Sequence, residues 1–230
     1  MTPVASAGPT DLIDPAPPPL DCDTPVARGW AAALWLLVGA WLIRLAVPMV
    51  ADAVQQLDDR VHGWAVSAEQ DVLVAAATLL DAFGGTLPMA AVVVIVALIL
   101  ARGRRWPGLA VWLLAMALSQ GLNVLIKTLY ERPRPPDALV EEHSWSFVSG
   151  HSLTAATIAI TLVLVFVPAG VRRRNLLIVA VAYALVMAAS RVYLRAHWLT
   201  DTYAGVAIGA ASAITVALAA SWWLARSQAA

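Results

Sequence analysis

The sequence predicts an all-α, polytopic membrane protein with six transmembrane helices in one bundle, and three observations support this fold class. Hydrophobic residues make up 60% of the 230 residues and charged residues only 13%, whereas soluble domains carry about 25% charged residues. Apolar runs of roughly 20 residues, the length that crosses a bilayer, recur along the chain. The polar breaks between them alternate between arginine-rich and acidic, as loops on opposite sides of a membrane do.

The apolar runs give the predicted crossings in chain order. They are residues 29–50, 86–101, 106–129, 152–168, 175–190 and 201–225. Between the first two crossings, residues 50–64 place apolar side chains at helical spacing with acidic ones on the other face, which predicts a short helix on the membrane surface. A second short helix over residues 71–83 ends at a pair of glycines and is able to lengthen the second crossing.

Residues 1–27 differ from the rest of the chain. They hold seven of the 14 prolines and four aspartates, a composition that buries too little apolar surface to offset the entropy of ordering. We therefore expect a disordered, proline-rich cytoplasmic tail, followed by the membrane domain over residues 28–230. The only cysteine, Cys22, excludes an intramolecular disulfide and is interpreted as an inert thiol in this tail. Arg44, near the end of the first crossing, is expected to extend its side chain to the interface.

The arginines predict the orientation of the bundle. The loops between crossings two and three and between four and five are arginine-rich and are expected in the cytoplasm, which places both termini there as well. The net charge is zero, so the composition offers no basic surface for nucleic acid. Four arginines nevertheless fall in the outward loops, where this rule disfavours them, and their placement suggests a function. They are Arg132, Arg134, Arg191 and Arg195.

Polar segments at the outward ends of crossings three to six carry the candidate chemistry, because charged groups in apolar surroundings are costly. A phosphate dianion in a water-poor pocket requires several fixed cationic donors. Lys127, Arg134 and Arg191 can supply them. Ser149 and the backbone N–H of Gly150 can add neutral donors.

Two histidines adjoin these donors. Phosphate hydrolysis needs a nucleophile and an acid for the leaving oxygen, and His151 and His197 can divide those tasks. Asp201 can hold the second ring nitrogen of His197 in either of two geometries. If Thr200 caps the last helix, His197 lies outside it and Asp201 lies in its first turn; otherwise His197 and Asp201 share one helical face.

These segments resemble the three motifs of the type 2 phosphatidic acid phosphatase family, the membrane branch of a superfamily with acid phosphatases and vanadium haloperoxidases. The first motif, lysine, six residues and Arg-Pro, starts at Lys127. The third, Ser-Arg, five residues, histidine, three residues and aspartate, starts at Ser190. In the second, Ser-Gly-His follows Val148 where the family usually has proline, which bears on the rigidity of the turn. The resemblance covers about residues 70–225.

The resemblance implies a lipid phosphatase of the cell membrane, with its site on the extracytoplasmic face. His197 is then the nucleophile that forms a phosphohistidine, and His151 protonates the leaving lipid oxygen, without a metal or cofactor. Undecaprenyl pyrophosphate is the preferred substrate, with phosphatidylglycerol phosphate or phosphatidic acid as alternatives. Phosphate transfer to another acceptor, and lipid phosphate binding or transport without catalysis, also stay open.

Other polar residues near the motifs are interpreted as structural. Arg132 and Arg195 each adjoin a motif arginine and are expected to meet lipid headgroups or acidic loop residues, outside the site. His62 and His143 are interpreted as packed or interfacial histidines.

Small and amide residues on crossings three and six predict helix packing near the site. Gly205 and Gly209 form a small-xxx-small pair, which favours a close approach of helices behind the site. Gln120 and Asn123 share a helical face with Lys127, and they either extend a polar wall toward the site or form interhelical hydrogen bonds.

Overall fold

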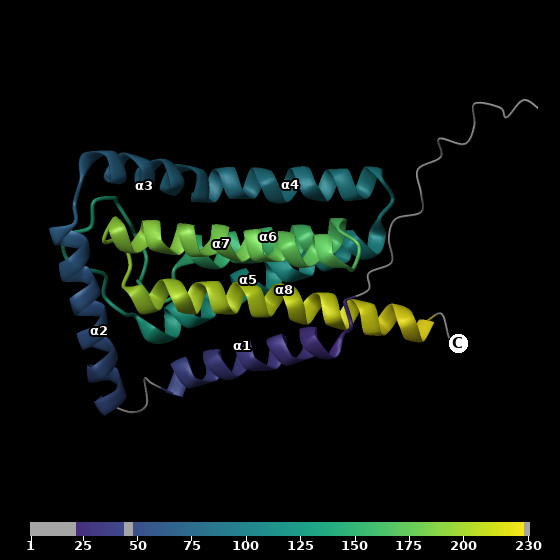
Figure 1. The fold of residues 1–230 in the computed structure, drawn as a ribbon, viewed down its shortest axis with the longest axis horizontal. Helices are drawn as coiled ribbons and strands as arrows, with labels where there is room; N and C mark the ends of the chain where they lie inside the picture. Colours follow the sequence, from purple (N-terminus) through teal and green to yellow (C-terminus); the bar gives the residue numbers. More distant parts are fainter. Residues whose placement is uncertain (1–21, 44–47, 228–230) are drawn as a thin grey trace, which may run out of the picture.

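The computed structural model describes residues 22–43 and 48–227, and every regular element in these ranges is a helix (Figure 1). The helices are α1 (Pro25–Ile43), α2 (Pro48–Ser67), α3 (Asp71–Gly84), α4 (Thr86–Arg102), α5 (Trp106–Tyr130), α6 (Gly150–Phe166), α7 (Val171–Tyr193) and α8 (Leu199–Ser227). The predicted all-α fold is therefore confirmed. From α2 onward, the helix bounds agree with the predicted segments to within a few residues.

The helices have the length and hydropathy of a membrane protein. In the described part of the chain, α5, α7 and α8 are each long and apolar enough to cross a bilayer. Helices α3 and α4 meet that criterion as a pair, with a bend of 48° at their junction. The sequence suggested this lengthening of the second crossing. Helices α1 and α6 are apolar but shorter, so the number of six crossings stays a prediction.

Helices α6 and α8 pack closely at the centre of the bundle (Figure 1). A methyl group on Gly205 would lie 2.7 Å from the backbone oxygen of Ser149, and one on Gly209 would lie 2.9 Å from Oγ1 of Thr157. Only glycine permits this approach of the two backbones. The packing predicted from the small-xxx-small pair is confirmed, and it fixes the start of α6 against α8.

Helix α2 runs across one end of the bundle, roughly perpendicular to the long helices (Figure 1). This direction agrees with the predicted surface helix, since a helix on a membrane lies across the spanning segments. Helix α3 instead packs along α7 and continues into α4. The arginine-rich turns, which are the turn after α4 and the first turn of α7, lie at the opposite end of the bundle from α2 (Figure 1).

The interpretation of Cys22 as a thiol in a disordered tail is wrong. Cys22 is 5% exposed and belongs to the main hydrophobic core cluster. Its backbone N–H donates to Oγ of Ser221 on α8 at 3.1 Å. Helix α1 begins three residues later, at Pro25, which lies within the predicted tail. Residues 1–21 and the predicted interfacial contact of Arg44 lie outside the described residues.

Candidate active site

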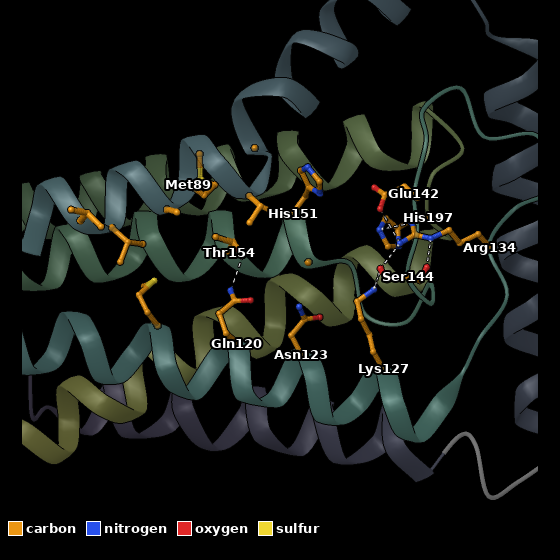
Figure 2. A pocket seen from close by; sticks show the side chains of 17 residues that line it. Met89, Gln120, Asn123, Lys127, Arg134, Glu142, Ser144, His151, Thr154 and His197 are labelled. Carbon is orange, nitrogen blue, oxygen red and sulfur yellow. Dashed lines mark hydrogen bonds and ion pairs between the residues drawn. The ribbon is translucent and has the colours of Figure 1, made fainter.

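A cavity of about 510 Å³ opens near the α2 end of the bundle (Figure 2). Five of the predicted site residues line it, from α5, α6 and the connecting loops: Lys127, Arg134, Gly150, His151 and His197. The remaining three, Ser149, Arg191 and Asp201, are fully buried behind this lining. The structure therefore gathers the three predicted segments around one site.

His197 lies on the short connection between α7 and α8 and is 2% exposed. Its Nε2 is 3.1 Å from Nη1 of Arg134, and its Nδ1 is 3.8 Å from Oδ2 of Asp201. Burial, assisted by the charge of Arg134, lowers the pKa of His197 to about 4, although Asp201 opposes this shift. The imidazole is therefore neutral near pH 7, with Nδ1 toward Asp201 and Nε2 toward the arginine.

Asp201 occupies the first turn of α8. Its Oδ2 accepts from the backbone N–H of Trp198 at 3.2 Å, which is the return bond of a capping box, and from Oγ of Ser146. Of the two geometries considered from the sequence, the structure shows the one with His197 outside the helix. Thr200 is not the cap residue, because α8 already begins at Leu199.

Arg132 was expected to meet lipid headgroups or acidic loop residues, and in the structure it contacts Asp58 and also Asp201. Its Nη1 donates to Oδ1 of Asp201 and, at 3.0 Å, to Oγ1 of Thr200. Its Nη2 donates to Oδ2 of Asp58 on α2 at 2.7 Å. Asp58 was expected on the polar face of a surface helix, yet its side chain is fully buried. Arg195, by contrast, pairs with the acidic loop residues, as expected.

The two motif arginines pair with carboxylates that the sequence did not identify. Arg191, fully buried, contacts both Asp81 of α3 and Glu142 of the loop after α5. Arg134 lies 3.1 Å from Oε2 of Glu142 and donates to the backbone oxygen of Ala196 at 2.6 Å. Burial alone would raise the pKa of Glu142, but both arginines outweigh it and keep that pKa below its usual range. Glu142 is therefore ionised and bridges the two cations.

His151 is the second residue of α6 and points into the cavity (Figure 2). Its Nε2 lies 3.2 Å from Oδ1 of Asp81. His151, Asp81 and Glu142 bring one ligand atom each to within 4.8 Å of one another, a spacing that a metal ion can share. Both carboxylates already contact Arg191, and a guanidinium beside the ligand atoms disfavours a second cation.

Ser149 does not present its hydroxyl to the cavity. It is the N-cap of α6 and accepts from the backbone N–H of Ser152 at 3.4 Å. Its own N–H donates to the backbone oxygen of Asp201 at 3.1 Å. Val148, which replaces the usual proline, is fully buried in a hydrophobic cluster. The second segment is thus held by capping and packing, with Gly150 at the cavity wall.

Lys127 and the amides of α5 follow the helical face predicted from their spacing. The Nζ of Lys127 lies 3.3 Å from Oγ of Ser144 and also contacts the backbone of the same loop. Gln120 donates to Oγ1 of Thr154 on α6 at 2.9 Å (Figure 2). Gln120 and Asn123 also line the cavity, so the polar wall and the interhelical hydrogen bond occur together.

A helical membrane bundle with histidines, arginines and lysine around a cavity at one end defines a class of integral membrane enzymes that act on phosphate groups. Comparison with known proteins agrees. The PAP2 superfamily profile matches residues 108–225. A phosphatidylglycerophosphatase B of Bacillus subtilis (strain 168) is 35% identical over 173 residues, which are 72% of this chain and 84% of the relative.

Two solved structures are also similar. A crystal structure of a transmembrane PAP2 type phosphatidylglycerolphosphate phosphatase from Bacillus subtilis has a TM-score of 0.70 and 28% identity, over 81% of this chain and 93% of that one. The crystal structure of Aquifex aeolicus LpxE has a TM-score of 0.56 and 23% identity, over 71% and 94%, and shows likeness of fold. The chain belongs to the PAP2 superfamily and is a membrane lipid phosphate hydrolase.

Proposed function

We propose that this enzyme removes the terminal phosphate of phosphatidylglycerol phosphate through a phosphohistidine on His197. The observation that carries the proposal is the two-part character of the cavity. One part holds polar and charged groups, including His197 and Arg134, and the other is apolar. A phosphorylated lipid likewise has a charged phosphate group and an apolar chain.

The apolar part lies between α4, α5 and α6 (Figure 2). It is lined by Met89, Ala90, Val93, Val94 and Met116. Lipid-facing side chains such as Ile95 and Leu98 are exposed on the adjoining surface of α4. A lipid phosphate that enters from the bilayer can therefore keep its chain among apolar groups while its phosphate reaches the histidines.

The first chemical step follows from the orientation of His197. With the ring proton on Nδ1 beside Asp201, the Nε2 lone pair attacks phosphorus while the bond from phosphorus to the lipid oxygen breaks. His151 donates a proton to that leaving oxygen. Arg134 and Lys127, which line the cavity, stabilise the charge on the phosphoryl oxygens, and Arg191 adds its positive charge from behind the cavity wall.

In the second step, water attacks the phosphohistidine and the phosphorus–nitrogen bond breaks. His151, now neutral, accepts the proton of that water, so the enzyme returns to its starting protonation state. Asp201 stabilises the positive charge on His197 while phosphate is attached. Inorganic phosphate and the dephosphorylated lipid are the products.

The choice of lipid follows the similar proteins. The preference for undecaprenyl pyrophosphate finds no support in the comparisons, whereas the similar sequence and the similar structure from Bacillus subtilis both carry names that specify phosphatidylglycerol phosphate. The phosphate-binding groups would serve either substrate, so a direct comparison is needed. The purified enzyme should release phosphate fastest from phosphatidylglycerol phosphate in a panel with phosphatidic acid and undecaprenyl pyrophosphate.

The controls separate substrate from mechanism. His197→Ala should abolish release, and a chelator should leave it unchanged. Faster turnover of undecaprenyl pyrophosphate would overturn the substrate but keep the mechanism. Appearance of a phosphorylated acceptor in place of free phosphate would show transfer, and tight lipid binding without turnover would show a binding protein.

We also propose that the cavity faces outward across the cell membrane, with both termini in the cytoplasm. The arginine-rich turns lie at the other end of the bundle from α2 (Figure 1), and such turns favour the cytoplasmic side. A cysteine introduced at Asp137 in a Cys22→Ser chain should react with a membrane-impermeant reagent on intact cells. A cysteine at Gly103 should react only after permeabilisation, and the reverse pattern would invert the orientation.

A further inference from the structure

Helix α2 connects to the catalytic histidine through an unbroken series of buried polar contacts. Asp58 is fully buried although it lies on a helix that crosses one end of the bundle. It accepts from the guanidinium of Arg132, which is 10% exposed and which also contacts Asp201. Asp201 in turn faces His197 at 3.8 Å. A buried charge is costly unless it is paired, so the buried carboxylate of Asp58 requires the guanidinium of Arg132 beside it.

We propose that Arg132 and Asp58 are positioning residues that hold the carboxylate of Asp201 and set the proton affinity of His197. This inference rests on the proposed role of His197 as nucleophile. Neither residue lines the cavity, so neither is expected to touch the substrate phosphate. Their effect passes through Asp201.

The contacts of Asp201 show how the orientation is fixed. Arg132 binds Oδ1, whereas Ser146, the backbone of Trp198 and Nδ1 of His197 all lie on the side of Oδ2. The two oxygens therefore have different partners, and rotation of the carboxylate would break both sets. Arg132 thus selects the oxygen that faces the imidazole.

Asp58 holds Arg132 in that position and also caps α8. Its Oδ2 accepts from Nη2 of Arg132 at 2.7 Å, and its Oδ1 accepts from the backbone N–H of Thr200 at 3.0 Å. Gln55, one turn earlier on α2, adds a contact to the same Nη2 at 2.7 Å. One face of α2 is therefore fitted to the start of α8 and to the arginine.

The charges in the network act on His197 in opposite directions. The positive charge of Arg132 disfavours a protonated imidazole, and the negative charge of Asp58 favours it. Removal of Asp58 should therefore lower the proton affinity of His197, whereas removal of the Arg132 charge should raise it. A purely structural role would not give opposite signs.

Several charged groups face His197 directly. They are Arg134 from the loop after α5, Asp201 on α8, Arg191 on α7 and Glu142 from the same loop as Arg134. Because single substitutions at Asp58 and Arg132 leave Arg134, Arg191 and Glu142 in place, a difference between the variants reports the network that acts through Asp201.

The test compares Asp58→Asn, Arg132→Gln and the double variant with the wild-type enzyme. We expect the acid limb of kcat/KM to move about half a pH unit down in Asp58→Asn and about half a unit up in Arg132→Gln. The double variant should return toward the wild-type limb. The value of kcat should fall roughly tenfold in each single variant with little change in KM, since the phosphate contacts are intact. Arg132→Lys, which keeps the charge, should keep the limb.

The matched control is Asp52→Asn, the same chemical change at an exposed position of α2. It should leave the profile unchanged. Thermal unfolding and gel filtration of each variant identify those that fail to fold, and the Arg132→Lys and double variants then decide. Limbs that move in the same direction, or that do not move in folded variants, would overturn the proposal.

A second readout keeps this inference separate from the proposed function. The titration of His197, followed by NMR of labelled histidine in detergent, does not require a substrate. If wild type releases no phosphate from any lipid, the proposed function fails, yet opposite shifts of the His197 titration would still support the network. If wild type hydrolyses a lipid phosphate but the variants leave the His197 titration unshifted, the proposed function stands and the network proposal fails.

Discussion

Nη1 of Arg134 lies 3.1 Å from Nε2 of His197. The guanidinium that would bind a phosphoryl oxygen and the nitrogen that would attack phosphorus thus lie beside the same phosphoryl position. The arginine also favours the neutral imidazole, because a second positive charge beside it is unfavourable. The contact between Arg134 and His197 therefore links phosphate binding to the neutral, nucleophilic form of the imidazole.

The first prediction concerns pH. Burial and Arg134 lower the pKa of His197 from 6.5 to about 4, and only the neutral imidazole is a nucleophile. The fraction of neutral His197 should therefore stay near one as the pH falls from 7 to 5, and should drop only around the lowered pKa. The NMR titration of His197 checks this, and protonation at about pH 6.5 would contradict it.

The second prediction concerns His151 as the acid. An alkyl leaving group needs a proton, whereas a nitrophenolate leaves without one. We expect His151→Ala to slow hydrolysis of the lipid phosphate by roughly 10²- to 10⁴-fold and to slow hydrolysis of p-nitrophenyl phosphate far less. Equal losses on both substrates would assign His151 to phosphate binding instead.

The third prediction concerns Glu142, which bridges Arg134 and Arg191. A phosphate must displace this carboxylate or share the arginines with it, so Glu142→Gln should tighten inhibition by inorganic phosphate by roughly three- to tenfold. The inhibition constant measures this, with the exposed neighbour substitution Glu141→Gln as control. Weaker inhibition in Glu142→Gln would show that the carboxylate aligns the arginines.

The fourth prediction concerns the packing of α6 on α8. A methyl group at Gly209 would overlap the backbone of Leu153, so Gly209→Ala should destabilise the protein by about 1–3 kcal/mol. Gly121→Ala on α5 has open space around it and should be neutral or stabilising. Thermal unfolding in one detergent compares them, and equal melting temperatures would contradict the close contact.

The fold followed from the sequence where a long apolar run is bounded by charges or glycines. Helices α4 and α5 were predicted to within one residue at each end for this reason. The start of α1 was missed because proline-rich composition argued for disorder, whereas Cys22 is held by long-range contacts with α8. A contact between residues so far apart in the chain cannot be predicted from the local sequence pattern.

The sequence likewise predicted some residues of the candidate site and missed others. His197 and Asp201 could be found because their spacing along the chain carries the chemistry. Asp58 and Asp81 could not, because Asp58 is one of three acidic residues on α2 and Asp81 is one of two on α3. Only the packing of the two helices decides which of these carboxylates faces the site. Arg132 did give a signal, since it lies in a loop that was predicted to face outward, where the orientation rule disfavours arginine.

The packing of α2 against the start of α8 has a consequence for how far this enzyme can be shortened. A chain trimmed to residues 70–225 would keep every motif residue and lose Asp58. Arg132 would then lose its carboxylate partner on α2, and the first turn of α8 would lose its cap. The residues that match the family profile, 108–225, therefore do not include all of the network that we propose to position Asp201.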